Sequence, residues 1–144
     1  MIEKIIYKKK LFALIVREKY RKKKGITFFT PPDFTQQFGY MKHRKKHIIQ
    51  SHKHSRRLIK ILISTEVILI LKGMLRVDFY TSLKKYLFSK ILKKNDIIML
   101  VHGGHGFKIL KDVEMLEVKQ GPYSLSKDKI KFENINESKI KIKK

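Results

Sequence analysis

Of all the features of this sequence, the strict alternation of apolar and polar side chains over residues 74–80 constrains the fold most, and it indicates a β fold. The alternating residues are, in order, Leu75, Arg76, Val77, Asp78, Phe79 and Tyr80. Successive side chains of a strand point to opposite faces, so the pattern predicts one apolar face and one polar face. Similar short runs recur with turn residues between them, which is typical of a sandwich or barrel. They are predicted over residues 26–29, 38–41, 47–54, 66–71, 87–92, 96–101, 107–110 and 113–118.

The length of 144 residues predicts one main domain with a segment at each end. Residues 1–25 form a basic N-terminal extension, in which residues 11–16 read as one strand or a short helix. Residues 26–132 form the predicted barrel, with a hairpin turn at Lys72-Gly73. Residues 133–144 are basic and are expected to be loose.

The chain has no cysteine, which excludes disulfides and thiolate metal ligands. This composition is compatible with a cytoplasmic protein. No apolar run approaches the roughly 20 residues of a membrane-spanning helix. The N-terminal residues also lack the layout of a secretory signal peptide.

The formal net charge of +23 is extreme. One interpretation is a polyanion partner, such as a nucleic acid or an anionic surface. The other is compositional bias, because lysine far outnumbers arginine and isoleucine is abundant, as in an AT-rich genome. Nucleic-acid readers depend more on arginine forks and exposed aromatic rings. The composition therefore favours bias, with nucleic acid as the less favoured partner.

Histidines and one glutamate suggest a metal site. On a strand, His52 and His54 would point to the same side of the sheet. Glu66 and His105 could complete a set of imidazole and carboxylate ligands for a divalent metal. Each residue also has a plainer interpretation: His52 and His54 as part of a basic patch, Glu66 in a salt bridge, and His105 as a structural histidine. His102 is expected to point away from this site.

These same residues resemble the two conserved motifs of the cupin superfamily. His52-Lys53-His54 with Glu66 resembles the first motif, and Asn95-Asp96 with Gly103-Gly104-His105 resembles the second. The stretch from Glu66 to Tyr80 and that from Glu114 to Tyr123 are similar to a group of small bacterial cupins often found with surface-polysaccharide genes. Asn95 stands where the second motif usually has glycine, and asparagine tolerates the positive φ of that turn.

The resemblance implies an antiparallel jelly-roll (cupin) barrel holding a divalent metal, Mn, Fe, Ni or Zn. It assigns metal ligation to His52, His54, Glu66 and His105. It implies a metal-dependent isomerase, epimerase or oxygenase acting on a small polar substrate such as a sugar or sugar nucleotide, with a non-catalytic ligand-binding or sensing protein as the alternative. No catalytic residue is assigned.

Five further residues are candidates for ligand binding: Arg76, Asp78, Tyr80, Gln120 and Tyr123. The first three share a face of one strand, where they could bind sugar hydroxyls or a phosphate. Cross-strand pairing on a solvent face is the equal alternative. Gln120 and Tyr123 flank a Gly-Pro turn that could lie at the barrel mouth. Because exposed strand edges favour pairing, a homodimer is also expected.

Overall fold

The structure, a computed structural model, describes residues 1–22, 24–122, 124 and 128–144. The chain forms two compact units, one of residues 1–20 with 64–144 and one of residues 21–63. Eight strands and one short 3-10 helix are present among the described residues: β1 (Ile2–Tyr7), β2 (Lys10–Val16), β3 (Gly25–Phe28), β4 (Gly39–Lys42), β5 (Glu66–Tyr80), β6 (Tyr86–Lys93), β7 (Ile97–Leu100), β8 (Gly104–Lys119) and η1 (Glu137–Lys139).

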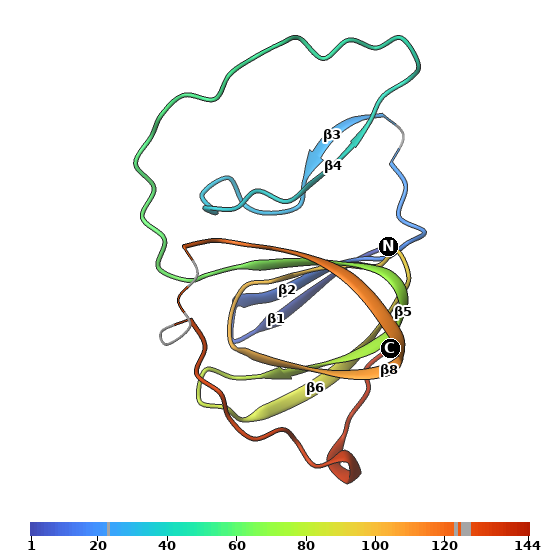
Figure 1. Cartoon of the computed structure of the whole chain (residues 1–144), viewed down its shortest axis with the longest axis vertical. Helices are drawn as coiled ribbons and strands as arrows, with labels where there is room; N and C mark the ends of the chain where they lie inside the picture. Colours follow the sequence, from blue (N-terminus) through green and yellow to red (C-terminus); the bar gives the residue numbers. More distant parts are fainter. Residues whose placement is uncertain (23, 123, 125–127) are drawn as a thin grey trace. The chain divides into compact units, whose positions relative to one another are not determined.

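The prediction of an all-β antiparallel fold is confirmed, because every pairing between these strands is antiparallel. In the larger unit the sheet order is β1-β2-β7-β5-β6, and β8 pairs with β5. Figure 1 shows β5 and β8 curving together as a ribbon, so that this sheet curls like half a barrel. None of the helices in the described part of the chain is long and apolar enough to cross a membrane.

β5 is one continuous strand of 15 residues, so the predicted hairpin at Lys72-Gly73 is wrong. The register between β5 and β8 shifts between Ile70 and Leu75, and Gly73 lies in this stretch with a φ of +83°. A Cβ at Gly73 would lie 1.9 Å from the carbonyl oxygen of Asp112 on β8. Glycine is required here because the two strands bend against each other, not because the chain reverses.

The alternation over residues 74–80 is confirmed. Leu75, Val77 and Phe79 belong to the buried core, together with residues of β1, β2, β6 and β7. The polar side chains of this strand are also buried, since Arg76 is 5% exposed and Asp78 is 4% exposed. Both faces of the second half of β5 are therefore covered.

The N-terminal 25 residues contain two strands of the larger sheet and the start of β3, where one strand or helix was predicted. β2 pairs with β1 on one side and β7 on the other, which makes it a central strand. Its residues Phe12 to Val16 are all buried. Asn95, in the turn before β7, has a φ of +66°, so the expected positive φ is confirmed.

The smaller unit contains the β3–β4 hairpin, with Gly25 paired to Lys42 and Phe28 paired to Gly39. Residues 47–54, predicted as a strand, have no regular secondary structure, so that prediction is wrong. This stretch is rich in basic and polar residues, and it is exposed along its whole length. Without an apolar face to bury, nothing fixes it as a strand.

Candidate functional site

Two of the four predicted metal ligands meet. Glu66 begins β5 and pairs with Lys119, whereas His105 lies near the start of β8 and pairs with Phe79 at the far end of β5. Because the β5–β8 ribbon curls, the Glu66 Oε2 and His105 Nε2 atoms lie 3.2 Å apart. The curl thus brings together a carboxylate and an imidazole that are 39 positions apart in the sequence.

The surroundings of Glu66 favour its ionised form. The hydrogen bond from His105, with further help from the positive charges of Lys129 and Lys119, lowers the pKa of Glu66, although burial of the carboxyl opposes this. Lys129 Nζ lies 3.9 Å from the second carboxylate oxygen of Glu66. The Glu66 side chain is 11% exposed and that of His105 is 28% exposed. The pair is therefore half-buried but within reach of solvent.

Gln120, a predicted ligand-binding residue, lies beside this pair. Its side-chain oxygen accepts hydrogen bonds from the Thr65 backbone N–H at 3.0 Å and from the Thr65 hydroxyl at 3.3 Å. Thr65 immediately precedes Glu66, so Gln120 fixes the start of β5. Tyr123, the other residue predicted at this turn, lies outside the described residues.

The separation of the Glu66 and His105 atoms fits a shared divalent cation. Carboxylate and imidazole bonds to such metals are about 2.1 Å long, which places neighbouring ligand atoms about 3.0–3.4 Å apart. The observed 3.2 Å falls in this range. A direct hydrogen-bonded pair has a similar separation, so the geometry suits both a proton and a metal ion between these groups.

His52 and His54 belong to the smaller unit, whereas Glu66 and His105 belong to the larger one. The His52 and His54 rings lie 5.4 Å apart, edge to face, and both residues are exposed. His52 Nδ1 is 2.9 Å from the Gln50 carbonyl oxygen. Across the residues that the structure describes, no three His, Asp or Glu side chains gather closely enough to hold a metal.

The remaining histidines have other surroundings. His102 Nδ1 lies 3.1 Å from the Leu11 carbonyl oxygen, so it contacts backbone rather than the Glu66–His105 pair. His43 and His47 stack at 4.2 Å between ring centroids. His47 is exposed and His43 is half-buried.

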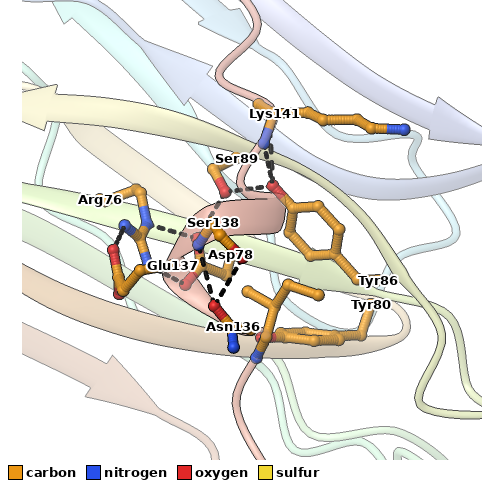
Figure 2. Close-up of polar contacts among 10 residues, drawn as sticks. Arg76, Asp78, Tyr80, Tyr86, Ser89, Asn136, Glu137, Ser138 and Lys141 are labelled. Atoms are coloured by element: carbon orange, nitrogen blue, oxygen red, sulfur yellow. Dashed lines mark hydrogen bonds and ion pairs between the residues drawn. The ribbon is translucent and has the colours of Figure 1, made fainter.

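The predicted set Arg76, Asp78 and Tyr80 lies on the face of β5 opposite Leu75 and Phe79. It is covered by the C-terminal segment. Arg76 contacts Glu137 of this segment, and the Tyr80 hydroxyl accepts a hydrogen bond from the Ile135 N–H at 3.0 Å. Residues 133–144 thus contact the sheet, where the sequence predicted a loose tail. Sequence reasoning missed Glu137 and Ser89, which complete this polar cluster (Figure 2).

No family model, no curated protein and no solved structure matches this chain.

Proposed function

We propose that this chain is a cupin-type protein with a jelly-roll barrel that binds a divalent metal and a small polar ligand. The observation that supports this most is the contact between Glu66 and His105. The resemblance to the cupin motifs assigns these two residues to one metal site, although they lie on different strands. The assignment of the two residues came from sequence motifs, whereas their contact comes from the fold, so the two observations are independent.

In this proposal, Glu66 and His105 would hold the metal from β5 and β8. The resemblance to the cupin motifs assigns the further imidazoles to His52 and His54. A bound divalent cation supplies Lewis acidity toward a carbonyl or hydroxyl oxygen of the ligand. Glu66 remains ionised and accepts the hydrogen bond of His105 in the absence of metal. Gln120 holds the start of β5 through Thr65, which keeps the Glu66 carboxylate in place.

Metal analysis of the full-length protein, purified without chelators, tests this proposal. We expect close to one equivalent of bound metal, or uptake on titration with Mn, Fe, Ni or Zn. Glu66→Gln and His105→Ala should each weaken binding by about tenfold or more. His102→Ala is the matched control, because His102 contacts backbone, and it should leave affinity unchanged. Less than about a tenth of an equivalent, with no uptake on titration, would reject the proposal.

Variants in the smaller unit test the two other metal ligands that the resemblance assigns. His52→Ala and His54→Ala should weaken metal binding as much as His105→Ala does. If only Glu66 and His105 matter, the site is built from the larger unit alone.

Catalysis is a separate question from binding. Sugars and sugar nucleotides are the first substrates to screen, with isomerisation, epimerisation and oxygenation as the reactions. Turnover that disappears in His105→Ala supports an enzyme. Ligand binding without turnover supports the non-catalytic alternative.

A polyanion-binding function has its own observation. Residues 42–60 contain eight lysine and arginine residues and no acidic residue. All eight are exposed. They are Lys42, Arg44, Lys45, Lys46, Lys53, Arg56, Arg57 and Lys60.

If these residues bind a polyanion, binding to mixed RNA should fall steeply between about 50 and 200 mM salt, because each neutralised phosphate releases a counterion. Replacing Lys45, Lys46, Arg56 and Arg57 by glutamine should reduce the salt slope, whereas weak binding at low salt rejects the function.

A further inference from the structure

The outer face of β5 and β6 carries a polar cluster that the strands themselves hold in place. Arg76 Nε and Nη2 donate to the two oxygens of Asp78 at 2.7 and 3.0 Å. The hydroxyl of Ser89 on β6 donates to the same carboxylate, and the Tyr86 hydroxyl lies 2.7 Å from Ser89 Oγ. All four residues belong to β5 and β6, so this arrangement does not depend on the C-terminal segment. We call it the Arg76 face (Figure 2).

The C-terminal segment supplies a carboxylate to this face. Arg76 Nη1 and Nη2 donate to the two oxygens of Glu137 at 2.7 and 3.0 Å, on the edge of the guanidinium that Asp78 leaves open. The Arg76 side chain is 6% exposed, whereas that of Glu137 is 61% exposed. The cation is thus part of the sheet, and its second anion comes from a surface segment. Two parallel hydrogen bonds are the geometry by which arginine selects carboxylates.

The same segment also adds backbone to the edge of the sheet. β6 ends the sheet order, and Ile142 forms a parallel bridge with Ser89. The Ser89 N–H donates to the Lys141 carbonyl at 2.8 Å, and the Lys143 N–H donates to the Ser89 carbonyl at 3.0 Å. Such pairing of an extended segment with a free strand edge is a common mode of peptide recognition.

Tyrosine hydroxyls accept two further backbone N–H groups of the segment. The Tyr86 hydroxyl accepts from Lys141 at 2.9 Å, and the Tyr80 hydroxyl accepts from Ile135 at 3.0 Å. Because these contacts involve backbone, they depend little on the identity of the side chains bound. Two contacts do select side chains: Arg76 binds Glu137, and Lys143 Nζ lies 4.3 Å from the centroid of the Phe88 ring.

None of residues 134–143 is fully buried. η1 contributes no buried residue. Ile142, at the bridge itself, is 55% exposed. Polar contacts of this kind replace hydrogen bonds to water, so their net contribution to stability is small. The entropy lost when the segment becomes ordered opposes this contribution. The segment is therefore the kind of element that opens locally while the sheet stays folded.

We propose that the Arg76 face is a docking site for an extended peptide that carries a glutamate, and that residues 134–143 occupy it as an internal ligand. A peptide in trans would present a glutamate to Arg76 and pair its backbone with Ser89 about four residues later. A basic residue two positions further would lie over Phe88. The proposal does not rest on the metal site, because Glu66 and His105 lie outside this cluster.

Binding of a peptide in trans to the full-length protein tests the proposal. The probe is a peptide of residues 133–144 that carries an uncharged fluorophore, followed by anisotropy. In the Glu137→Gln protein the internal ligand is weakened, so this protein should bind the probe about tenfold more tightly than the wild type. Glu133→Gln is the matched control, since Glu133 is exposed and lies just before the segment, and it should bind like the wild type.

A second probe tests the role of the peptide carboxylate on the same Glu137→Gln protein. A peptide with glutamine in place of the residue corresponding to Glu137 should bind the Glu137→Gln protein about tenfold more weakly than the original peptide. The peptide and the protein are both positively charged, so non-specific attraction does not mimic the result. Equal binding of the two peptides, or no binding at millimolar peptide to a folded Glu137→Gln protein, would overturn the proposal and leave the segment as an intramolecular brace only.

Discussion

Glu66 and His105 pair with residues at opposite ends of the β5–β8 ribbon, yet their side chains meet at 3.2 Å. The contact exists only because the ribbon curls, since a flat ribbon of this length would keep its two ends far apart. The pair is therefore sensitive both to the curvature of the sheet and to the ionisation of the two groups.

Glu66→Gln should make stability less dependent on pH. The pKa of Glu66 is lower in the folded chain than its ordinary value of 4.5, chiefly because of the hydrogen bond from His105. A lowered folded pKa means that the contribution is present above about pH 4.5 and is lost as the pH falls through the folded value. We expect Glu66→Gln to lose about 1 kcal/mol near neutral pH and little in acid.

Urea unfolding at several pH values between about 7 and 3 measures this difference. Glu117→Gln is the control, because Glu117 is an exposed carboxylate on the same strand as His105. If the curves of the wild type and Glu66→Gln run parallel, the hydrogen bond does not stabilise the fold.

Gly73→Ala should destabilise the larger unit by about 2–4 kcal/mol. The added methyl would both force a non-glycine residue to a φ of +83° and meet the Asp112 carbonyl. Gly25→Ala is a matched control for the strain alone, because Gly25 has a φ of +91° with no atom within 4 Å of the added Cβ. It should cost about 1–2 kcal/mol. If thermal unfolding shows the same loss of stability for both variants, β5 and β8 move apart enough to accommodate the added methyl group.

Asp78→Ala should cost about 3–5 kcal/mol, because it leaves the buried guanidinium of Arg76 with only the exposed Glu137. The exposed pair of Lys72 and Glu114, at 3.4 Å, provides the contrast. Glu114→Ala should change the free energy of unfolding by about 0.5 kcal/mol or less. Urea unfolding of the two variants side by side gives the comparison, and similar costs would mean that water reaches Arg76.

Arg17→Lys should destabilise the sheet by about 1–2 kcal/mol. Arg17 donates to Glu3 at 2.6 Å, to Asp96 at 2.8 Å and to the Ile91 carbonyl at 2.7 Å. It therefore joins β1 to the end of β6 and the start of β7, and a single ammonium cannot reproduce these three directions. Arg44→Lys, at an exposed position, is the control and should leave the thermal midpoint unchanged. A midpoint equal to wild type for Arg17→Lys contradicts the prediction.

Much of the sheet could be predicted from the sequence where alternation is strong. Leu75, Val77 and Phe79 take the buried face that their spacing indicated. The pattern could not show that β5 continues through Lys72-Gly73, because glycine with a positive φ serves a bend as well as a turn. The long-range pairing with Asp112 decides between the two, and short-range sequence does not contain it.

The candidate site was less accessible to sequence reasoning. Glu66 and His105 could be joined only through the resemblance to the cupin motifs, because no local pattern reports that the two ends of a ribbon meet. The role of Glu137 gave no signal, because nothing in the sequence near it names a partner for its carboxylate. The one available indication was the pair Arg76 and Asp78 within an otherwise apolar strand, which needs a polar partner if it is buried.

The open side of β8 has a practical consequence. This strand of 16 residues pairs only with β5 in the described part of the chain, and Leu116 and Val118 are 57% and 60% exposed on it. It carries three lysines and three acidic residues, so it is neutral within a chain of net charge +23. Such a strand is a template for edge-to-edge association, which the surrounding lysines oppose only while salt is low. Dilute protein at low ionic strength is therefore the condition in which refolding competes best with aggregation.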